Sequence, residues 1–402
     1  MSKASTAKTT TAPTPAAPAV ASIHVLFPRT AFLALLKLAL PVIDAKSPMP
    51  ALNNVLVDVS SGKITVTATD LYRSVFGVVD EAVATSKPGT IALPAKGLFQ
   101  RIEAMPEGPV ELIVEDVAVT VRSGVRKSLS YKMTGVHATE YPVVVMPKDD
   151  MAWTTVPSDA ARTILDKTLF SASDDHTRPM INCVYVVARD GKLTGYSGDG
   201  HRVSRMAIDV EGIAAMEVMI PKAGAEHLRK VVDEAVERKL PVEIGVSGPD
   251  CFFRVEKIRY SVKLFDVKPF PYDSVLPESA TYRARLPRLA MLASVKAMML
   301  TADDKSSQIS LSFHGGELTL SAKDATKGEG TDVLAIDYDG PDFTVCFFAP
   351  YVADALARID SDEIIFDSDG APVSMTDARP TVFRAAAPVE GFAFVTVVAP
   401  AM

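Results

Sequence analysis

Hydrophobic residues in this chain recur first at a helical and then at a strand-like spacing, and this order appears three times. One face of the first predicted helix is apolar, with Phe32, Leu35, Leu36, Ala39 and Leu40, and the second unit repeats this face with Ile164, Leu165 and Leu169. That spacing is typical of an amphipathic helix packed on one side. Strand-like runs joined at glycine follow each helix, over 55–68, 184–191 and 309–316, and they predict a hairpin in every unit.

Prolines mark where the predicted helices begin. The first helix of each unit is expected to open at Pro28, Pro157 and Pro287, and the second at Pro94, Pro221 and Pro350. At the first helical position, proline loses only an N–H that would be unpaired anyway. The spacings all lie between 127 and 130 residues, and such a period predicts repeated domains. We therefore expect three similar domains, at 23–148, 149–278 and 279–402.

The first 22 residues differ from the rest because they are almost entirely Ala, Thr, Ser and Pro. This composition predicts a disordered N-terminal tail, with an organellar address or an expression remnant as alternatives. The three cysteines, Cys183, Cys251 and Cys346, lie far apart, which favours core thiols in a reducing compartment over disulfides or a metal site. No run approaches the roughly 18 apolar residues of a membrane span. We expect a soluble cytoplasmic protein without membrane contact.

Charge is unevenly distributed between the predicted helices and the rest of the chain. The six helical segments together carry a net charge of +5, although the whole chain carries −7. The remainder therefore carries −12. This partition favours helices that face a polyanion and contact phosphates without reading bases. The alternative is that surface helices simply favour Lys and Arg.

Five short motifs, in the right order on the repeat, resemble the bacterial β sliding clamp, the DNA polymerase III beta subunit family. They are the stretch 48–56, the end of the first hairpin at 69–71, the loop 174–182, the turn Asp199-Gly200-His201-Arg202-Val203, and Phe270-Pro271 followed by Val275-Leu276-Pro277. The resemblance runs from about Ile23 to Met402. It implies an α+β fold of three DNA-clamp domains, each with two helices on antiparallel sheets, which form a ring as a head-to-tail dimer.

The function that the resemblance implies is that of a non-catalytic processivity factor. The homodimer would encircle double-stranded DNA without sequence preference and tether the DNA polymerase III catalytic subunit, the clamp loader and other proteins with a clamp-binding motif. No cofactor and no metal are expected. The implied partner-peptide cleft comprises Ile181, Gly200, His201, Arg202, Val203, Pro271, Val275, Leu276, Pro372, Val373, Val397, Val398, Ala399, Pro400 and Ala401.

The chain departs from the family in this implied cleft. The segment between Pro271 and Val275 is one residue short, and Ser274 stands where a basic residue is usual. The chain also ends in Ala399-Pro400-Ala401-Met402, where larger methionine side chains and a terminal Arg-Leu are common in the family. Partner affinity or identity is therefore expected to differ, as in a specialised paralogue. The resemblance further implies DNA contacts at Lys46, Lys96, Arg101, Arg178 and Lys222, and a dimer interface with Leu129, Tyr131, Met299 and Leu300.

Two other classes of function compete with this interpretation. A metal-dependent hydrolase could use Asp199, His201 and Asp70, but the other histidines show no paired ligand spacing, and Asp-Gly is a common turn dipeptide. A repeat scaffold without a nucleic-acid role is the second alternative.

Overall fold

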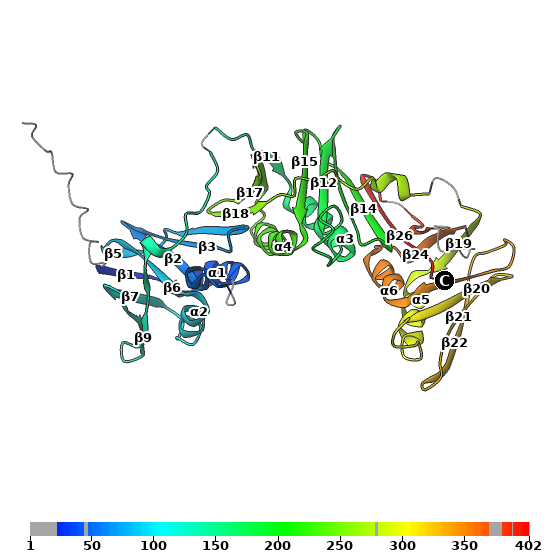
Figure 1. Ribbon diagram of the computed structural model, residues 1–402, viewed down its shortest axis with the longest axis horizontal. Helices are drawn as coiled ribbons and strands as arrows, with labels where there is room; N and C mark the ends of the chain where they lie inside the picture. Colours follow the sequence, from blue (N-terminus) through cyan, green and yellow to red (C-terminus); the bar gives the residue numbers. More distant parts are fainter. Residues whose placement is uncertain are drawn as a thin grey trace, which may run out of the picture. The chain divides into compact units, whose positions relative to one another are not determined.

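The computed structural model describes residues 22–43, 47–148, 150–277, 280–369, 380–387 and 389–401. They form two units (Figure 1): the first holds the described residues up to Asp70 and 76–143, and the second holds 71–75 and those from Val144 onward. The predicted tail lies outside the described residues except for Ser22. None of the helices in these ranges combines the length and the apolar character that a membrane crossing needs.

The predicted threefold order of elements is confirmed. Each repeat runs strand, helix, three strands, strand, helix, three strands, and the first repeat adds β5 and β10. The first repeat contains β1 (Ser22–Pro28), α1 (Arg29–Ala39), β2 (Asn54–Ser60), β3 (Lys63–Thr69), β4 (Arg73–Val79), β5 (Ala84–Lys87), β6 (Gly89–Pro94), α2 (Ala95–Glu103), β7 (Pro109–Glu115), β8 (Ala118–Ser123), β9 (Ser130–Thr134) and β10 (Val136–His137).

The second repeat contains β11 (Thr154–Val156), α3 (Ser158–Thr168), β12 (Cys183–Arg189), β13 (Lys192–Gly198), β14 (Arg202–Asp209), β15 (Met216–Pro221), α4 (Lys222–Glu237), β16 (Val242–Ser247), β17 (Asp250–Val255) and β18 (Ile258–Lys263). The third contains β19 (Tyr282–Pro287), α5 (Arg288–Met298), β20 (Gln308–His314), β21 (Glu317–Asp324), β22 (Gly328–Ala335), β23 (Phe343–Phe348), α6 (Ala349–Arg358), β24 (Glu363–Ser368), β25 (Thr381–Ala385) and β26 (Phe392–Val398).

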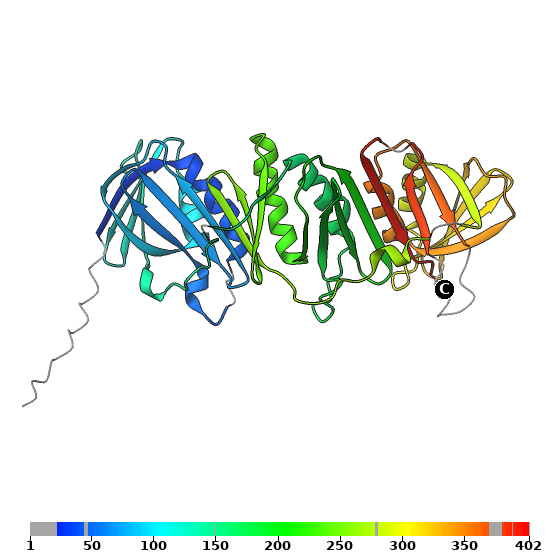
Figure 2. The same cartoon turned by 90° about the horizontal axis from the view of Figure 1, so that it is seen from above.

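All described strand pairs with a named register are antiparallel, so the α+β class is confirmed. The first unit has one sheet in the order β5-β1-β7-β8-β9, and its second set of strands follows β10-β6-β2-β3-β4. The second unit has β18-β17-β16-β11, the eight-stranded β15-β12-β13-β14-β26-β25-β24-β19 and the four-stranded β22-β21-β20-β23. Figures 1 and 2 show the pairs α3–α4 and α5–α6 on one face of the strands of their own repeat.

Local sequence explains the hairpins and corrects the helix starts. Gly62 and Gly191 both have φ +72°, a conformation that glycine adopts without steric cost, so the predicted turns are confirmed. Five of the six prolines, however, are N-cap residues with ψ between 106° and 142° and not the first helical residues: Pro28, Pro94, Pro157, Pro221 and Pro287. An extended N-cap suits the fixed φ of proline and costs the helix no N–H. Only Pro350 lies inside the first turn of its helix, α6.

The second and third repeats share one sheet because β14 pairs with β26, from Arg202 opposite Val398 to Ile208 opposite Phe392. We call this pair of strands the seam. At its centre, the hydroxyls of Ser204 and Thr396 lie 3.1 Å apart and are fully buried. The seam therefore joins the two repeats through backbone hydrogen bonds and a buried side-chain contact.

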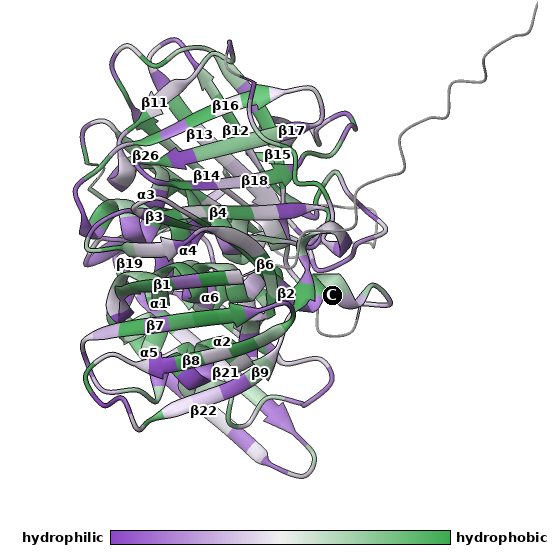
Figure 3. Ribbon diagram, turned by 90° about the vertical axis from the view of Figure 1, so that its left-hand side faces the viewer, coloured by the Kyte–Doolittle hydropathy of each residue, from purple (hydrophilic) through white to green (hydrophobic). Residues whose placement is uncertain are grey.

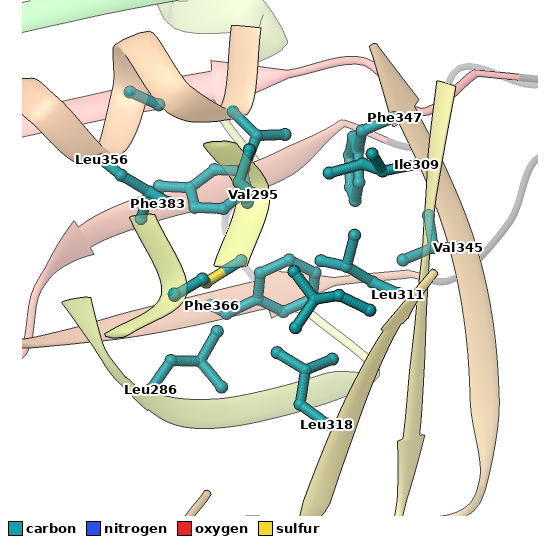
Figure 4. Close-up of a cluster of buried hydrophobic side chains, with 14 of the residues drawn as sticks. Leu286, Val295, Ile309, Leu311, Leu318, Val345, Phe347, Leu356, Phe366 and Phe383 are labelled. Atoms are coloured by element: carbon teal, nitrogen blue, oxygen red, sulfur yellow. The ribbon is translucent and has the colours of Figure 1, made fainter. Parts of the chain in front are cut away.

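The third repeat has an aromatic core between its two helices and its sheets (Figure 4). Phe366 and Phe383 meet edge to face, with ring centroids 5.3 Å apart, and Phe347 packs on both. Val295 and Leu356 approach these rings from α5 and α6 and are fully buried. Burying such side chains contributes about 1.5–3 kcal/mol each, which fixes the helices on the strands.

Candidate functional site

One end of the seam opens into a pocket of about 330 Å³, which we call the cleft. Its described lining is Arg178, Ile181, Gly198, Gly200, His201, Arg202, Val203, Phe270, Tyr272, Ser274, Val275, Leu276, Pro277, Pro380, Val397 and Ala399. These residues come from both repeats and from the segment 264–277 between them, here called the connector. No carboxylate stands among them. The cleft is thus an apolar hollow with a few basic groups at its edge.

The turn 199–202 shapes one wall of the cleft. The Asp199 carboxylate accepts hydrogen bonds from the backbone N–H groups of His201 and Arg202, at 2.9 and 3.0 Å. Gly200 has φ +97°, and a side chain added there would approach the guanidinium of Arg178. The sequence Asp-Gly therefore serves to turn the chain tightly beside the cleft.

The connector is held by aromatic contacts that sequence reasoning missed. Tyr272 is buried, and its ring stacks on Tyr196 at 5.5 Å and on Tyr185 at 6.2 Å. Its hydroxyl donates to the carbonyl of Met180 at 3.2 Å. Phe270 meets Tyr272 edge to face. An aromatic pair two residues apart in a Pro-rich segment was the available signal.

Burial disfavours the charged form of Tyr272, which lines the floor of the cleft, and of Cys183, which contacts Tyr272 but lies outside the lining. It raises the pKa of the Cys183 thiol to about 12 and the pKa of the Tyr272 phenol above its usual range. Both groups are neutral near pH 7 even at their ordinary pKa values, and burial keeps them neutral at higher pH as well. An apolar ligand can pack on this floor without desolvating an ion.

The structure brings together most, but not all, of the residues expected in the cleft. Ile181, Gly200, His201, Arg202, Val203, Val275, Leu276, Val397 and Ala399 line it. Val398 instead faces the core of the third repeat and is fully buried, because alternate strand residues point to opposite faces. Pro271 and Pro400 are outside the lining, and the backbone of Ala401 bonds to Cys346. Pro372 and Val373 lie outside the described residues.

Several basic residues on the helices bind groups within their own repeat. Fewer of them are therefore available to a polyanion than the net charge of the helices predicts. Arg29 at the start of α1 donates to the carbonyls of Ile102 and Glu103 at the end of α2. Arg288 at the start of α5 likewise donates to the carbonyls of Leu356 and Ser361. These arginines satisfy carbonyls at a helix end that would otherwise lack partners. They stabilise the helix pair and do not face outward as expected.

The second repeat goes further, because its helix charges form a network. Arg229 contacts Asp166 at 2.6 Å and also pairs with Asp233, and Arg162 lies 3.4 Å from Asp233. In contrast, the exposed Lys37, Lys96, Lys230 and Lys296 form no ion pair with any described residue. The outward positive charge of the helices is therefore concentrated on lysines.

The residues expected to contact DNA occupy different surroundings. Lys96 is exposed on α2, and the guanidinium of Arg101 donates to the carbonyl of Gly97 at 2.9 Å. Lys222 is bound to Asp174 at 2.6 Å. Arg178 lines the cleft, and Lys46 lies outside the described residues.

The residues expected at the dimer interface are at or near exposed edges. Tyr131 lies in β9, the last strand of its sheet, and Leu129 directly precedes that strand. Met299 and Leu300 follow α5, and Leu300 is 78% exposed. Met299 beside it is 37% exposed, so two adjacent apolar side chains are open to solvent at this place.

The geometry also bears on the hydrolase alternative. The Asp199 carboxylate is engaged by its own turn and by the Arg202 guanidinium at 3.0 Å. No cluster of three His, Cys, Asp or Glu side chains that could hold a metal occurs in the described ranges. His201 stacks on Tyr351. Asp199 and His201 thus have structural roles in the turn.

Three family models match consecutive parts of the chain. They describe the N-terminal, central and C-terminal domains of the DNA polymerase III beta subunit, over residues 23–146, 155–272 and 273–379. The chain belongs to the DNA polymerase III beta subunit family. Its function is that of a DNA sliding clamp, a processivity factor in replication, and members of this family are non-catalytic accessory subunits.

Relatives of this family resemble the chain over nearly its whole length. The beta sliding clamp of Pseudomonas aeruginosa is 23% identical over 351 residues, which cover 86% of this chain and 92% of that one. The solved DNA polymerase III subunit beta of Bartonella birtlesii, bound to griselimycin, has a TM-score of 0.86 at 22% identity. The solved beta sliding clamp of C. crescentus has a TM-score of 0.84 at 24% identity. Both structures are matched over 95% of this chain and 100% of their own.

Proposed function

We propose that two copies of the chain close a ring around double-stranded DNA and hold partner proteins by short peptides bound in the cleft. The single observation that carries the ring is the seam. In the seam, two different repeats are joined edge to edge. β14 is the last of the three strands that follow the first helix of the second repeat, and it pairs with β26, the last of the three strands that follow the second helix of the third repeat.

Two strands equivalent to those of the seam stand at sheet ends. The equivalent of β14 in the third repeat is β22, and the equivalent of β26 in the first repeat is β9. Both lie last in the order of their sheets among the described strands. β22 is also largely exposed, and Figure 3 draws it mostly in pale and hydrophilic colours. Pairing β22 of one copy with β9 of the other would repeat the seam twice and satisfy both edges.

The side chains beside these edges suit such a head-to-tail homodimer. Met299 and Leu300 on one copy would pack near Leu129 and Tyr131 on the other, which would remove exposed apolar surface from water. Sedimentation should give twice the chain mass of 43.0 kDa. Leu300→Asp should shift the protein toward the monomer, and Leu289→Asp, at an exposed leucine in the first turn of α5, should not. A monomeric parent protein would refute the ring.

DNA contacts are proposed for the outward lysines of the helices. Lys37 and Lys296 occupy the same place, nine residues after Pro28 and Pro287, while the second repeat has Asp166 there. Lys96 on α2 is exposed as well. Phosphate contacts by such flexible cations give affinity without sequence readout, as sliding requires. Arg101, Arg178 and Lys222 remain candidates, although Lys222 would first have to release Asp174.

The cleft is proposed to bind an extended peptide with apolar anchors, from the DNA polymerase III catalytic subunit, the clamp loader or other proteins with a clamp-binding motif. Its apolar floor with basic groups at one edge supports this ligand class. Ser274 turns its hydroxyl back to the carbonyl of Pro271 at 2.7 Å and adds no charge. We infer that the cleft of this chain favours partners whose peptides carry fewer acidic residues beside the connector, as in a specialised paralogue.

Fluorescence anisotropy tests peptide binding directly. The probe is a fluorescein-labelled peptide that carries the clamp-binding segment of a bacterial DNA polymerase III catalytic subunit. Saturable binding that an unlabelled copy displaces is expected, and a peptide with its apolar anchors changed to alanine should not compete. Lack of measurable binding by the intact dimer would refute the role of the cleft.

A further inference from the structure

One wall of the cleft rests on a helix of the neighbouring repeat. The ring of His201 stacks on the ring of Tyr351 in α6, with centroids 6.2 Å apart and planes 24° apart. The guanidinium carbon of Arg202 lies 4.4 Å from the centre of the same ring. Two successive lining residues of the second repeat, His201 and Arg202, are therefore positioned by contacts with the third repeat.

The Arg202 guanidinium has three polar partners. It donates to the Asp199 carboxylate at 3.0 Å, to the Phe170 carbonyl at 2.8 Å and to the Asp354 carboxylate at 2.6 Å. Asp199 and Phe170 belong to the second repeat, whereas Asp354 belongs to α6. Asp354 follows Tyr351 by three residues, so both lie on the same face of the helix. Asp354 itself is outside the lining of the cleft.

We propose that Asp354 is a positioning residue for peptide binding. It holds the Arg202 guanidinium against Tyr351, so that Arg202 keeps its place in the wall of the cleft. This inference rests on the proposed peptide binding and adds a residue that does not touch the peptide.

Physical considerations separate this role from a general contribution to stability. The Asp354 side chain is 51% exposed, and ion pairs with an exposed partner add little to the free energy of folding. The Arg202 side chain is only 11% exposed, so a lost acceptor leaves a charged N–H group in search of another partner. Removing Asp354 should therefore alter the cleft more than it alters stability.

The chain offers a matched control at the same junction. Lys167 of α3 binds the Asp360 carboxylate at 2.5 Å, which also joins the second repeat to the third. Asp360 is exposed and lies away from the cleft lining. Asp360→Ala removes an ion pair of the same kind between the same repeats, and it leaves the contacts of Arg202 intact.

The test measures the affinity of the labelled polymerase peptide for the intact dimer and its variants. Asp354→Ala should weaken binding roughly fivefold to tenfold, the size expected when one long side chain must be immobilised on binding, with the thermal midpoint nearly unchanged. Asp354→Glu should restore most of the affinity, because its carboxylate can still reach the guanidinium. Asp360→Ala should leave the affinity within about twofold.

A double-variant comparison decides whether Asp354 acts through Arg202. In an Arg202→Ala background, Asp354→Ala should have no further effect on the affinity. An equal loss in both backgrounds, or equal losses for Asp354→Ala and Asp360→Ala, would overturn the inference while leaving the peptide site in place. Failure of the parent protein to bind the peptide would instead overturn the proposed function, and the inference with it.

Discussion

The cleft differs from a second pocket of similar size, about 360 Å³, at the opposite end of the seam on its helix face. This helix-side pocket is lined by Thr163, Lys167, Met206, Ile359, Asp360, Arg384, Ala385, Val389, Phe392, Ala393, Phe394 and Val395. Here the basic groups are neutralised, since Lys167 binds Asp360 and Arg384 binds Asp367. In the cleft, Arg202 is paired with Asp199 and Asp354, but Arg178 forms no ion pair with a described residue.

This difference teaches that volume alone does not mark a binding site. The helix-side pocket is a gap whose polar groups already satisfy one another, and its ion pairs tie the second repeat to the third. The cleft presents an apolar floor on a connector that aromatic rings hold in place. Variants that change the packing or the charge of one pocket therefore test whether the cleft alone binds the peptide.

The largest expected effect comes from removing the anchor of the connector. Tyr272→Ala deletes a buried ring from the stack with Tyr185 and Tyr196 and should cost about 3–5 kcal/mol of unfolding free energy in the second unit. Peptide affinity should fall with it. Tyr272→Phe keeps the ring, loses the hydroxyl contacts with Met180 and Cys183, and should cost about 1 kcal/mol. Urea unfolding measures both, and equal losses would contradict the packing role of the ring.

Placing a charge in each pocket tests their difference in function. Leu276→Asp in the cleft should weaken binding of the labelled peptide by 2 kcal/mol or more, as for a central interface residue. That is roughly 30-fold. Val389→Asp in the helix-side pocket, where the side chain is 59% exposed, should leave peptide affinity unchanged. If both variants reduce anisotropy equally, the two pockets are not functionally distinct.

A smaller effect is expected from the centre of the seam, between the two pockets. Thr396→Val leaves the buried Ser204 hydroxyl without its partner and should cost about 1–2 kcal/mol. The matched variant Thr344→Val breaks an exposed hydroxyl pair with Ser312 and should change stability by less than about 0.5 kcal/mol. Equal midpoints in urea for both variants would show that the buried Ser204–Thr396 contact stabilises the protein no more than an exposed hydroxyl pair does.

The smallest expected effect is a dependence of stability on alkaline pH. Burial raises the pKa of Tyr272, in the lining of the cleft, and of Tyr351, which supports the cleft wall at His201 and Arg202. An unfolded tyrosine has a pKa of about 10. The neutral, buried tyrosines therefore contribute fully to the free energy of unfolding below that pH, and this contribution declines as the pH rises above it, because the unfolded chain can then lose the proton more easily. Urea midpoints between pH 8 and 11 should fall, and Tyr272→Phe should reduce this fall. A fall of the same size in the variant would assign it to other groups.

Local patterns in the sequence were enough to predict the repeats. Helical periodicity and hairpin turns such as Gly62 depend on neighbours within a few residues, and both predictions are confirmed. The roles of Arg29 and Arg288 were missed because each reaches a helix end about 70 positions further along the chain. Charge counting therefore overstated how many cations the helices present to a polyanion.

The cleft was beyond the reach of periodicity. Residues such as Val203 and Val397 read as ordinary strand residues, and only the family resemblance placed them in a cleft. The error at Val398 has a simple cause: the resemblance covered a run of residues, whereas a strand sends alternate side chains to opposite faces. Tyr272 and Asp354 matter through contacts with distant segments, so no local pattern revealed them.

The central claim is that the protein is topologically linked to DNA. The most direct measurement is its retention on nicked circular DNA during gel filtration, at a salt concentration that removes purely electrostatic binding. The protein is first diluted until the dimer dissociates and is then concentrated with the circles, so that rings can close around them. We expect it to elute with the circles and to be released when each circle is cut once. Equal retention before and after cutting, or none on intact circles, would contradict the ring.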